Sequence, residues 1–344
     1  MRFSVTSDPA VWQTFLNGFS PPFRDIYFTH DYINLSVLNS EGTGAAAIFE
    51  GDRGVRAIYP FLICKIPNQS AGGQWSDIQT PYGYGGPLVE GSNASDLAFF
   101  HEAHSEWCRA NAIVAEFVRF HPLLGTHLSA PPEMLVERNR PTVIVDLRSG
   151  YNAVFRGFTP ARQRNIRKAS RARLDIFESQ DITTFYKLYH KTMERIGASP
   201  YYLFSPSYFS GLARLIPEKC IIFEARHDGT AIASAVFLKG AGCLHYHLGG
   251  SDRNELALSP NDFLMSKAME WAIENGFQSL HLGGGATTSA DDSLLRFKSG
   301  FAPASGEFFI GKRIHHRDKY DSFMADWRRR TGRSPRKFLA YHDV

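Results

Sequence analysis

The sequence predicts an α/β protein built from two halves of similar size, residues 1–150 and 151–344. Its 344 residues exceed the length at which a single hydrophobic core usually stops growing, roughly 250 to 300 residues. Hydrophobic residues make up 43% and charged residues 21%, a balance typical of a chain that buries its own core. In both halves, helical periodicity alternates with short apolar runs that indicate strands.

The first half begins with helical patterns and continues with strands on either side of a loop. Its expected elements, in order, are helices 9–17 and 29–38, strands 45–50 and 55–66, helix 95–111, and strands 113–120 and 142–147. The segment 74–88 is rich in glycine, proline and tyrosine and is expected to form a loop. The segment 123–140 contains several prolines and is expected to be a connector.

The second half repeats this plan with clearer turn signals. Its expected elements, in order, are helix 162–172, strand 174–178, helix 182–196, strands 220–227, 231–239 and 243–249, a further helix, strand 279–282 and the short helix 293–299. The three central strands are joined by an Asp-Gly turn and a glycine-containing turn, which predicts an antiparallel meander. Each half therefore predicts a mixed, mostly antiparallel sheet flanked by helices.

The helix that follows the meander has well-defined boundaries. Ser259 is the expected N-cap, Pro260 occupies the first helical position, Asp262 lies in the first turn and Gly276 ends the helix. Its apolar residues follow the spacing of one helical face, which predicts burial of that face.

The net charge of +4 is unevenly distributed. Six of the twelve residues from Arg162 to Arg173 are basic, and a second basic stretch runs from Lys312 to Lys337. Both stretches suit contact with the phosphates of a nucleotide, a lipid carrier or an RNA. Two solvated helix faces are the alternative.

The N-terminus lacks a signal-peptide pattern, and no run approaches the ~20 apolar residues of a membrane span. We therefore expect a cytoplasmic protein whose only membrane contact is peripheral, through its basic helices. The four cysteines are scattered in apolar segments, which predicts buried, reduced thiols. No cysteine or histidine spacing predicts a metal site.

Three stretches resemble the Fem-type family, the double-GNAT transferases that move amino acids from aminoacyl-tRNA onto peptidoglycan precursors, and its GNAT and BioF2-like relatives. They are TPYGYGGPLVEG (80–91), RQRNIRKASRARL (162–174) and the long stretch from YHLGGSD to KSGFAP (246–303). The resemblance implies two tandem GNAT-like domains. It also implies that strands 243–249 and 279–282 splay apart at one end, with the acyl donor in the gap between them.

In the Fem-type pattern, a lysine followed closely by Gly-Phe stands where this chain has Lys298. The resemblance implies that its ammonium group stabilises the negative charge that develops on the carbonyl during acyl transfer. Gly283, Gly284 and Gly285 allow close backbone approach to a ligand and, with Phe297, are expected to contact the donor. A surface lysine and a loop that merely turns the chain are the alternatives.

The acceptor side of the site is expected to combine the arginine-rich helix with the first-half loop. The helix presents Arg164 and Arg167, together with Lys168 and Arg171, along one face, and the resemblance implies that this face approaches phosphates. Further substrate contacts are expected from Tyr82, Tyr84, Gly85 and Tyr246. The loop composition suits a cleft wall for a sugar or peptide, or an Ω-loop with internal packing.

Glu90 is a candidate for the base that deprotonates the attacking amine. It follows a Gly-Pro pair at a position where some family members carry an acid. His245, His247 and His281 alternate on strands, and we expect at least one of them to face the core.

Two departures bear on the donor. The segment 251–260 lacks the glycine-rich, pyrophosphate-binding loop of acetyl-CoA-dependent GNATs, and no coiled-coil arm for tRNA is evident. We expect no tightly bound cofactor and a donor that is either aminoacyl-tRNA or acyl-CoA. The expected acceptor is a phosphate-bearing small molecule or lipid-linked cell-envelope or polysaccharide precursor, and DNA is not an expected partner. An acyl-CoA-dependent N-acetyltransferase acting on a sugar or small amine, and a non-catalytic ligand-binding module, are the alternatives.

Overall fold

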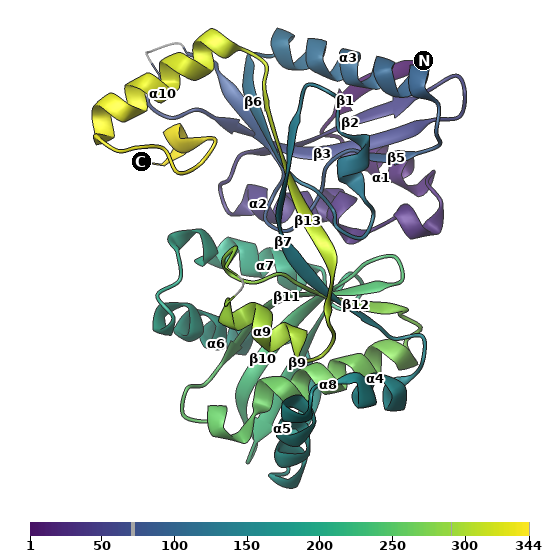
Figure 1. The fold of residues 1–344 in the computed structure, drawn as a ribbon, viewed down its shortest axis with the longest axis vertical. Helices are drawn as coiled ribbons and strands as arrows, with labels where there is room; N and C mark the ends of the chain where they lie inside the picture. Colours follow the sequence, from purple (N-terminus) through teal and green to yellow (C-terminus); the bar gives the residue numbers. More distant parts are fainter. Residues whose placement is uncertain (70–72, 290, 344) are drawn as a thin grey trace. The chain divides into compact units, whose positions relative to one another are not determined.

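The computed structural model describes residues 1–69, 73–289 and 291–343 and divides into two compact units (Figure 1). One unit combines Met1–Asn139 with Phe308–Val344, and the other is Arg140–Glu307. The division differs from the expected split after residue 150. Strand β7 (Leu135–Asp146) runs from the first unit into the second, and β13 (Ala304–Ile314) returns the chain to the first.

The first unit contains a mixed sheet in the order β1-β2-β3-β4-β6-β13, with β5 paired to β3. Neighbouring strands are antiparallel except β4 and β6, which run parallel. Its remaining strands are β1 (Arg2–Thr6), β2 (Thr43–Glu50), β3 (Arg56–Lys65), β4 (Ser76–Gln79), β5 (Leu88–Glu90) and β6 (Ile113–Arg119).

Helices and short 3₁₀ turns surround the first-unit sheet. They are α1 (Pro9–Asn17), α2 (His30–Leu38), α3 (Ala94–Ala110), α10 (Arg317–Thr331), η1 (Pro21–Phe23), η2 (Ile26–Phe28), η3 (Thr126–Ser129) and η6 (Ala340–His342). Phe100 of α3 packs on Phe49 of β2 with ring centroids 5.7 Å apart, within one apolar core. Met324 and Trp327 of α10 belong to a second core that includes Val114 of β6.

The second unit contains a sheet in the order β7-β12-β11-β10-β9-β8. Only β11 and β12 run parallel, because the crossover helix α8 connects them. Its other strands are β8 (Asp175–Ser179), β9 (Cys220–His227), β10 (Thr230–Lys239), β11 (Cys243–Ser251) and β12 (Ser279–Gly283).

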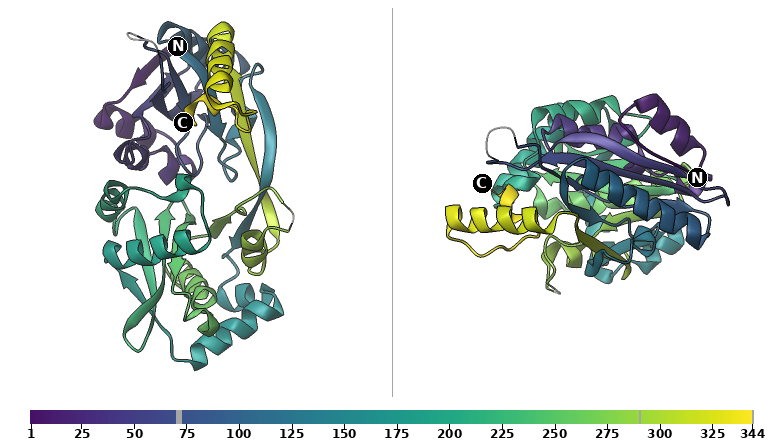
Figure 2. Two further views of the ribbon diagram at one scale, coloured as in Figure 1. Left: turned by 90° about the vertical axis from the view of Figure 1, so that its left-hand side faces the viewer. Right: turned by 90° about the horizontal axis from the view of Figure 1, so that it is seen from above.

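Helices cover both faces of this sheet (Figure 2). They are α4 (Tyr151–Gly157), α5 (Pro160–Arg171), α6 (Ile182–Arg195), α7 (Pro206–Arg214), α8 (Pro260–Glu274) and α9 (Ser293–Ser299), with 3₁₀ turns η4 (Pro200–Tyr202) and η5 (Leu256–Leu258). On one face, Trp271 of α8 packs on Phe223 of β9. On the other, the hydroxyl of Tyr208 in α7 lies 2.7 Å from Nε2 of His247 in β11.

The predicted meander, crossover helix and following strand are confirmed in the second unit. The prediction missed the short elements β1, β5 and α4, the strongly polar helix α10, and also α7 and β13. The expected loop 74–88 contains β4, and the expected connector 123–140 contains the first half of β7. Both segments pair through backbone hydrogen bonds although neither shows clear apolar alternation.

Ser259 occupies the N-cap position of α8 but does not cap it as predicted. The preceding turn η5 leaves Ser259 in a left-handed conformation with φ of +59°, and its hydroxyl makes no capping hydrogen bond. The four cysteines are buried and unpaired, as predicted. Within the described residues, none of the helices combines the length and the apolar character needed to cross a bilayer.

Candidate functional site

Strands β11 and β12 separate after a short paired segment. Their parallel pairing covers only three positions, from Cys243 opposite Ser279 to His245 opposite His281. Strand β11 continues to Ser251 beyond this pairing. Strand β12 continues to Gly283, so the two strands stop pairing before either ends, as the predicted splay requires.

Strand β12 ends at the first of three consecutive glycines, and the surroundings of the last two leave no room for side chains. Gly283 has φ of +73°, a conformation that favours glycine. A Cβ on Gly284 would lie 2.8 Å from the carbonyl oxygen of Pro141, and a Cβ on Gly285 would lie 2.5 Å from Oδ1 of Asp292. The close approach to backbone and to a carboxylate therefore explains two of the glycines.

Asp292 joins this glycine turn to helix α9. Its carboxylate accepts hydrogen bonds of 2.8 Å from the amides of Leu295 and Thr287 and one of 2.9 Å from the Thr287 hydroxyl. Burial raises the pKa of Asp292, but these hydrogen bonds outweigh burial and lower the pKa to about 2. An ionised N-cap thus fixes the start of the helix that carries Lys298.

Lys298 is buried, with 6% of its surface exposed. Its Nζ donates a hydrogen bond of 2.7 Å to the carbonyl oxygen of Gly284 and lies 5.5 Å from the centre of the Tyr246 ring. Burial lowers the pKa of Lys298 to about 7; the Asp292 carboxylate opposes this shift and Arg140 adds to it. In its ammonium form Lys298 has two further N–H donors beyond the one bonded to Gly284.

Arg162 of α5 contacts helix α9 through the ring of Phe297. Its guanidinium donates a 2.6 Å hydrogen bond to Asp262 and lies 4.4 Å from the centre of the Phe297 ring and 5.7 Å from that of Phe301. A Cβ on Gly300 would lie 2.5 Å from its Nε. Gly300 and Phe301, the Gly-Phe pair that follows Lys298, therefore lie against the side chain of Arg162.

The arginines of α5 differ in burial: Arg162 is partly buried, and the arginines of the predicted face are exposed. Ile166 and Ala169 are buried, whereas Arg164 and Arg167 are exposed. Arg162 shares the spacing of the buried face and was missed because it was treated as one of several surface cations. The i, i+4, i+7 relation of residues 162, 166 and 169 is the signal that identifies it.

Tyr246 lies between the sheet core and Lys298. It is half-buried, its ring packs 5.6 Å from that of Phe237, and burial raises its pKa to about 12. The phenol is therefore protonated at neutral pH. Its predicted contact with substrate stays a prediction.

The predicted loop residues of the first unit are held by contacts within that unit. The Tyr82 carbonyl accepts a 2.5 Å hydrogen bond from Tyr32, and the ring of Tyr84 packs 5.4 Å from that of Tyr27. The Gly85 amide donates a 2.7 Å hydrogen bond to the carbonyl oxygen of Arg119, at the end of β6. The loop therefore has the internal packing that was one of its two expected roles. Its contacts with substrate stay predictions.

Glu90 and Lys298 lie in different units. Both carboxylate oxygens of Glu90 accept hydrogen bonds from the amide of Ser20, at 3.1 and 3.3 Å. This contact gives Glu90 a structural function in the first unit. Its role as a base stays a prediction.

The three strand histidines of the second unit are all buried. Nδ1 of His245 lies 3.5 Å from Nδ1 of His281. Burial, aided by His245, lowers the pKa of His247 to about 3, so this ring is neutral at physiological pH. The expectation that at least one histidine faces the core is confirmed.

Residues 160–299 match the family model described as acetyltransferase (GNAT) domain. Among solved structures, FemX shares 14% identity and a TM-score of 0.73 over 94% of this chain and 99% of its own. The C-terminal domain of a putative lysylphosphatidylglycerol synthetase from Agrobacterium fabrum shares 15% identity and a TM-score of 0.54, covering 93% of this chain and 97% of that one. L-PGS from Bacillus licheniformis shares 12% identity and a TM-score of 0.54, covering 89% and 92%. None of the curated proteins matches in sequence.

These matches concern the fold of the chain. The likeness to FemX extends over nearly the whole length of both chains, which confirms the predicted fold class. The family model matches residues 160–299, which lie within the second unit. The chain therefore has the fold of FemX, and part of its second unit is similar to the GNAT acetyltransferase domain.

Proposed function

We propose that this protein transfers an aminoacyl group from an activated ester to an amine of a phosphate-bearing cell-envelope or polysaccharide precursor. The observation that carries the proposal is the position of Lys298, buried beside the splay of β11 and β12 and hydrogen-bonded to the glycine turn. In the GNAT plan this gap holds the acyl donor.

In the proposed reaction, the acceptor amine attacks the ester carbonyl. A C–N bond forms, the C–O bond to the leaving alcohol breaks, and the proton lost by the amine ends on the leaving oxygen. Negative charge develops on the carbonyl oxygen in the transition state, and the ammonium form of Lys298 stabilises it. Because the group is buried, the stabilisation is stronger than in water, and the loss of one such donor typically costs about 10²–10³ in rate.

Two features favour an aminoacyl ester over a coenzyme A thioester. The segment before α8 has no glycine between residues 251 and 260. The first turn of α8 also contains the buried carboxylate of Asp262, which is paired with Arg162. A pyrophosphate at this helix end would approach a negative charge, in contrast to the usual phosphate site at a helix N-terminus.

Two observations support the proposed acceptor: the exposed arginines of α5 and the name of one similar structure. Arg164 and Arg167 present exposed cations on α5, which suits a phosphate-bearing molecule. The name of one neighbour, lysylphosphatidylglycerol synthetase, describes a product in which an amino acid is joined to a phospholipid. A lipid-linked or nucleotide-linked amine is therefore the proposed acceptor class.

An acyl-CoA-dependent N-acetyltransferase is the second candidate, because the matching family model carries the name acetyltransferase. The two candidates differ in the donor. Native mass spectrometry of the purified protein, with and without added coenzyme A, measures binding of that donor directly. Transfer assays with [¹⁴C]aminoacyl-tRNA and with [¹⁴C]acetyl-CoA, each with lipid-linked and nucleotide-linked amines, then measure activity.

We expect acceptor-dependent release of the amino acid from tRNA and no retained coenzyme A. Transfer from acetyl-CoA alone, together with retained coenzyme A, would contradict the aminoacyl donor and favour the second candidate. Absence of transfer from both donors would contradict both.

A further inference from the structure

The basic C-terminal stretch concentrates positive charge well beyond that of the chain as a whole. Residues 312–337 contain ten lysines and arginines against three aspartates, a net charge of +7, whereas the entire chain carries +4. The remainder of the sequence is therefore acidic on balance. So strong a local excess marks a surface for a polyanion.

Helix α10 displays much of this charge on the side facing away from its own core. Met324 and Trp327 are buried, whereas Arg328, Arg329 and Arg330 are all exposed. The last two lie 3.5 Å from Asp326, which offsets part of their charge. With fifteen residues the helix is about 22 Å long, so its cations span several phosphates of a strand.

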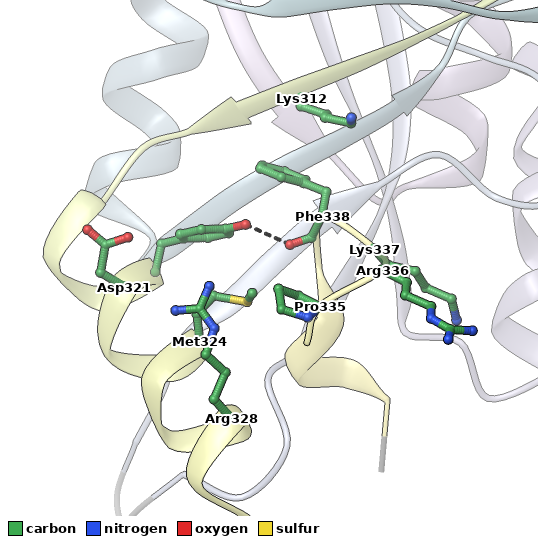
Figure 3. Close-up of a pocket in the computed structure, with 9 residues that line it drawn as sticks. Lys312, Asp321, Met324, Arg328, Pro335, Arg336, Lys337 and Phe338 are labelled. Atoms are coloured by element: carbon green, nitrogen blue, oxygen red, sulfur yellow. Dashed lines mark hydrogen bonds between the residues drawn. The ribbon is translucent and has the colours of Figure 1, made fainter. Parts of the chain in front are cut away.

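A cavity of about 450 Å³ lies beside α10 and is lined by cations from three separate segments (Figure 3). Lys312 comes from β13, Arg328 from α10, and Arg336 and Lys337 from the segment that follows the helix. Met324, Pro335 and Phe338 add apolar lining, and Asp321 contributes one carboxylate to the four cations. The volume is within the range of small-molecule sites and suits one nucleotide-sized group.

The cations of this cavity differ in their partners. Lys312 pairs with Glu137, and Lys337 lies 2.8 Å from Asp343. Within residues 1–69, 73–289 and 291–343, neither Arg328 nor Arg336 pairs with a carboxylate. These two guanidinium groups are thus available to an external phosphate.

Hydrogen bonds fix the chain that lines the cavity and the residues that follow it. Within the lining, the Tyr320 hydroxyl donates a 2.7 Å hydrogen bond to the carbonyl oxygen of Phe338 (Figure 3). Asp77 of β4 accepts a 3.0 Å hydrogen bond from the Tyr341 hydroxyl and lies 2.7 Å from Nε2 of His342. The indole of Trp327 donates a 2.9 Å hydrogen bond to the carbonyl of Asp343. The segment after α10 is therefore anchored to the sheet of the first unit, so the site is formed in advance of any ligand.

The burial of the apolar residues of α10 distinguishes between RNA and a membrane as the binding partner. A helix that lies on a bilayer buries large apolar side chains in the interface. Here those side chains pack into the protein: among the described residues from 312 onward, no large hydrophobic side chain is exposed. The surface offers cations and a cavity without an inserting face, which favours RNA over lipid.

We propose that the RNA site of this protein is formed by Lys312, Arg328, Arg329, Arg330, Arg333, Arg336 and Lys337, with one nucleotide of the RNA in the cavity. The proposal rests on the proposed function, because an aminoacyl-tRNA donor brings an RNA to the protein. These residues all belong to the first unit, and the RNA binds on its surface.

The test measures binding of a fluorescent RNA hairpin with a single-stranded CCA end by anisotropy, at several salt concentrations. The test variant combines Arg328→Ala, Arg329→Ala and Arg336→Ala. Its matched control combines Arg53→Ala, Lys187→Ala and Lys191→Ala, which removes three exposed cations elsewhere. We expect the test variant to lose at least tenfold in affinity at 0.1 M salt. Its slope of log K against log salt should flatten by about 2, as for three lost contacts to single-stranded phosphates.

The control variant should bind as the wild type does. Equal losses in both variants would overturn the proposal, because binding would then follow total charge. Binding to phosphatidylglycerol vesicles that depends on the same arginines, without RNA binding, would also overturn it. The Lys298→Met variant separates the two claims: RNA binding that survives this change while transfer is lost supports both, and RNA binding with no transfer in wild type defeats the proposed function alone.

Discussion

The Nζ atom of Lys298 lies 2.7 Å from the carbonyl oxygen of Gly284 and donates a hydrogen bond to it. This contact joins α9 to the end of β12, at the point where β12 has separated from β11. The same lysine is buried and titrates near pH 7. The glycine turn and Lys298 are therefore structurally coupled, and we expect a change in either to alter the conformation of the other.

Gly285→Ala should lower both stability and activity. Its Cβ would lie 2.5 Å from Oδ1 of Asp292, so the carboxylate must move from its capping position on α9. Loss of an N-cap typically costs about 1 kcal/mol, and we expect a loss of that size in urea unfolding with at least a tenfold lower kcat. Gly157→Ala is the matched control, since no atom lies within 4 Å of its Cβ. Equal effects of the two changes would contradict this explanation.

Arg162→Lys should reduce kcat about tenfold while the KM values for donor and acceptor change little. The substitution retains a cation near Asp262 but removes the planar group that packs on Phe297, and α9 then holds Lys298 less firmly. The pH profile of kcat should shift together with the rate. A loss of stability with an unchanged profile would show that Arg162 only supports the fold.

Arg164→Ala should act on the acceptor instead. This arginine is exposed on α5, so its removal should leave the free energy of unfolding within about 0.5 kcal/mol of wild type. We expect the acceptor KM to rise several-fold with kcat nearly unchanged. Steady-state kinetics with a phosphate-bearing acceptor and its dephosphorylated form measures this, and an equal effect on both acceptors would contradict phosphate binding by Arg164.

Stability should depend on pH through Lys298. Its pKa falls from 10.5 to about 7 on burial, so between these values the unfolded chain binds more protons and the folded state gains stability as pH rises. Below about pH 7 the lysine is protonated in both states and its full burial cost remains. Urea unfolding of wild type and Lys298→Met from pH 6 to 9 measures this. The stability of wild type relative to the variant should increase with pH, by at most about 1.4 kcal/mol per pH unit, and a constant difference would contradict the shift.

Sequence periodicity was sufficient for the parts of the fold with strong local signals. The meander from Cys220 to Ser251 follows from its short apolar runs and the turn residues between them. Helix α10 was missed because its residues are largely polar, and strand β13 because its pairing partner β6 lies far away in the sequence.

The candidate site was predictable in its glycines and its lysine, because a motif carries them. The contacts that give them their properties were not. Arg162 and Asp262 are a hundred residues apart in the sequence, and only the folded chain joins them. Burial of Lys298, which sets its pKa, likewise depends on packing among α9, β11 and the glycine turn.

The most direct test of the account is single-turnover transfer by Lys298→Met, with Lys298→Arg beside it. Far-UV circular dichroism and urea unfolding first establish that both variants are folded. We predict that Lys298→Met lowers the rate of transfer at least 100-fold while the affinity for the donor stays within about threefold, as expected when an oxyanion donor is removed. A folded Lys298→Met protein that retains transfer within threefold of wild type would contradict the account.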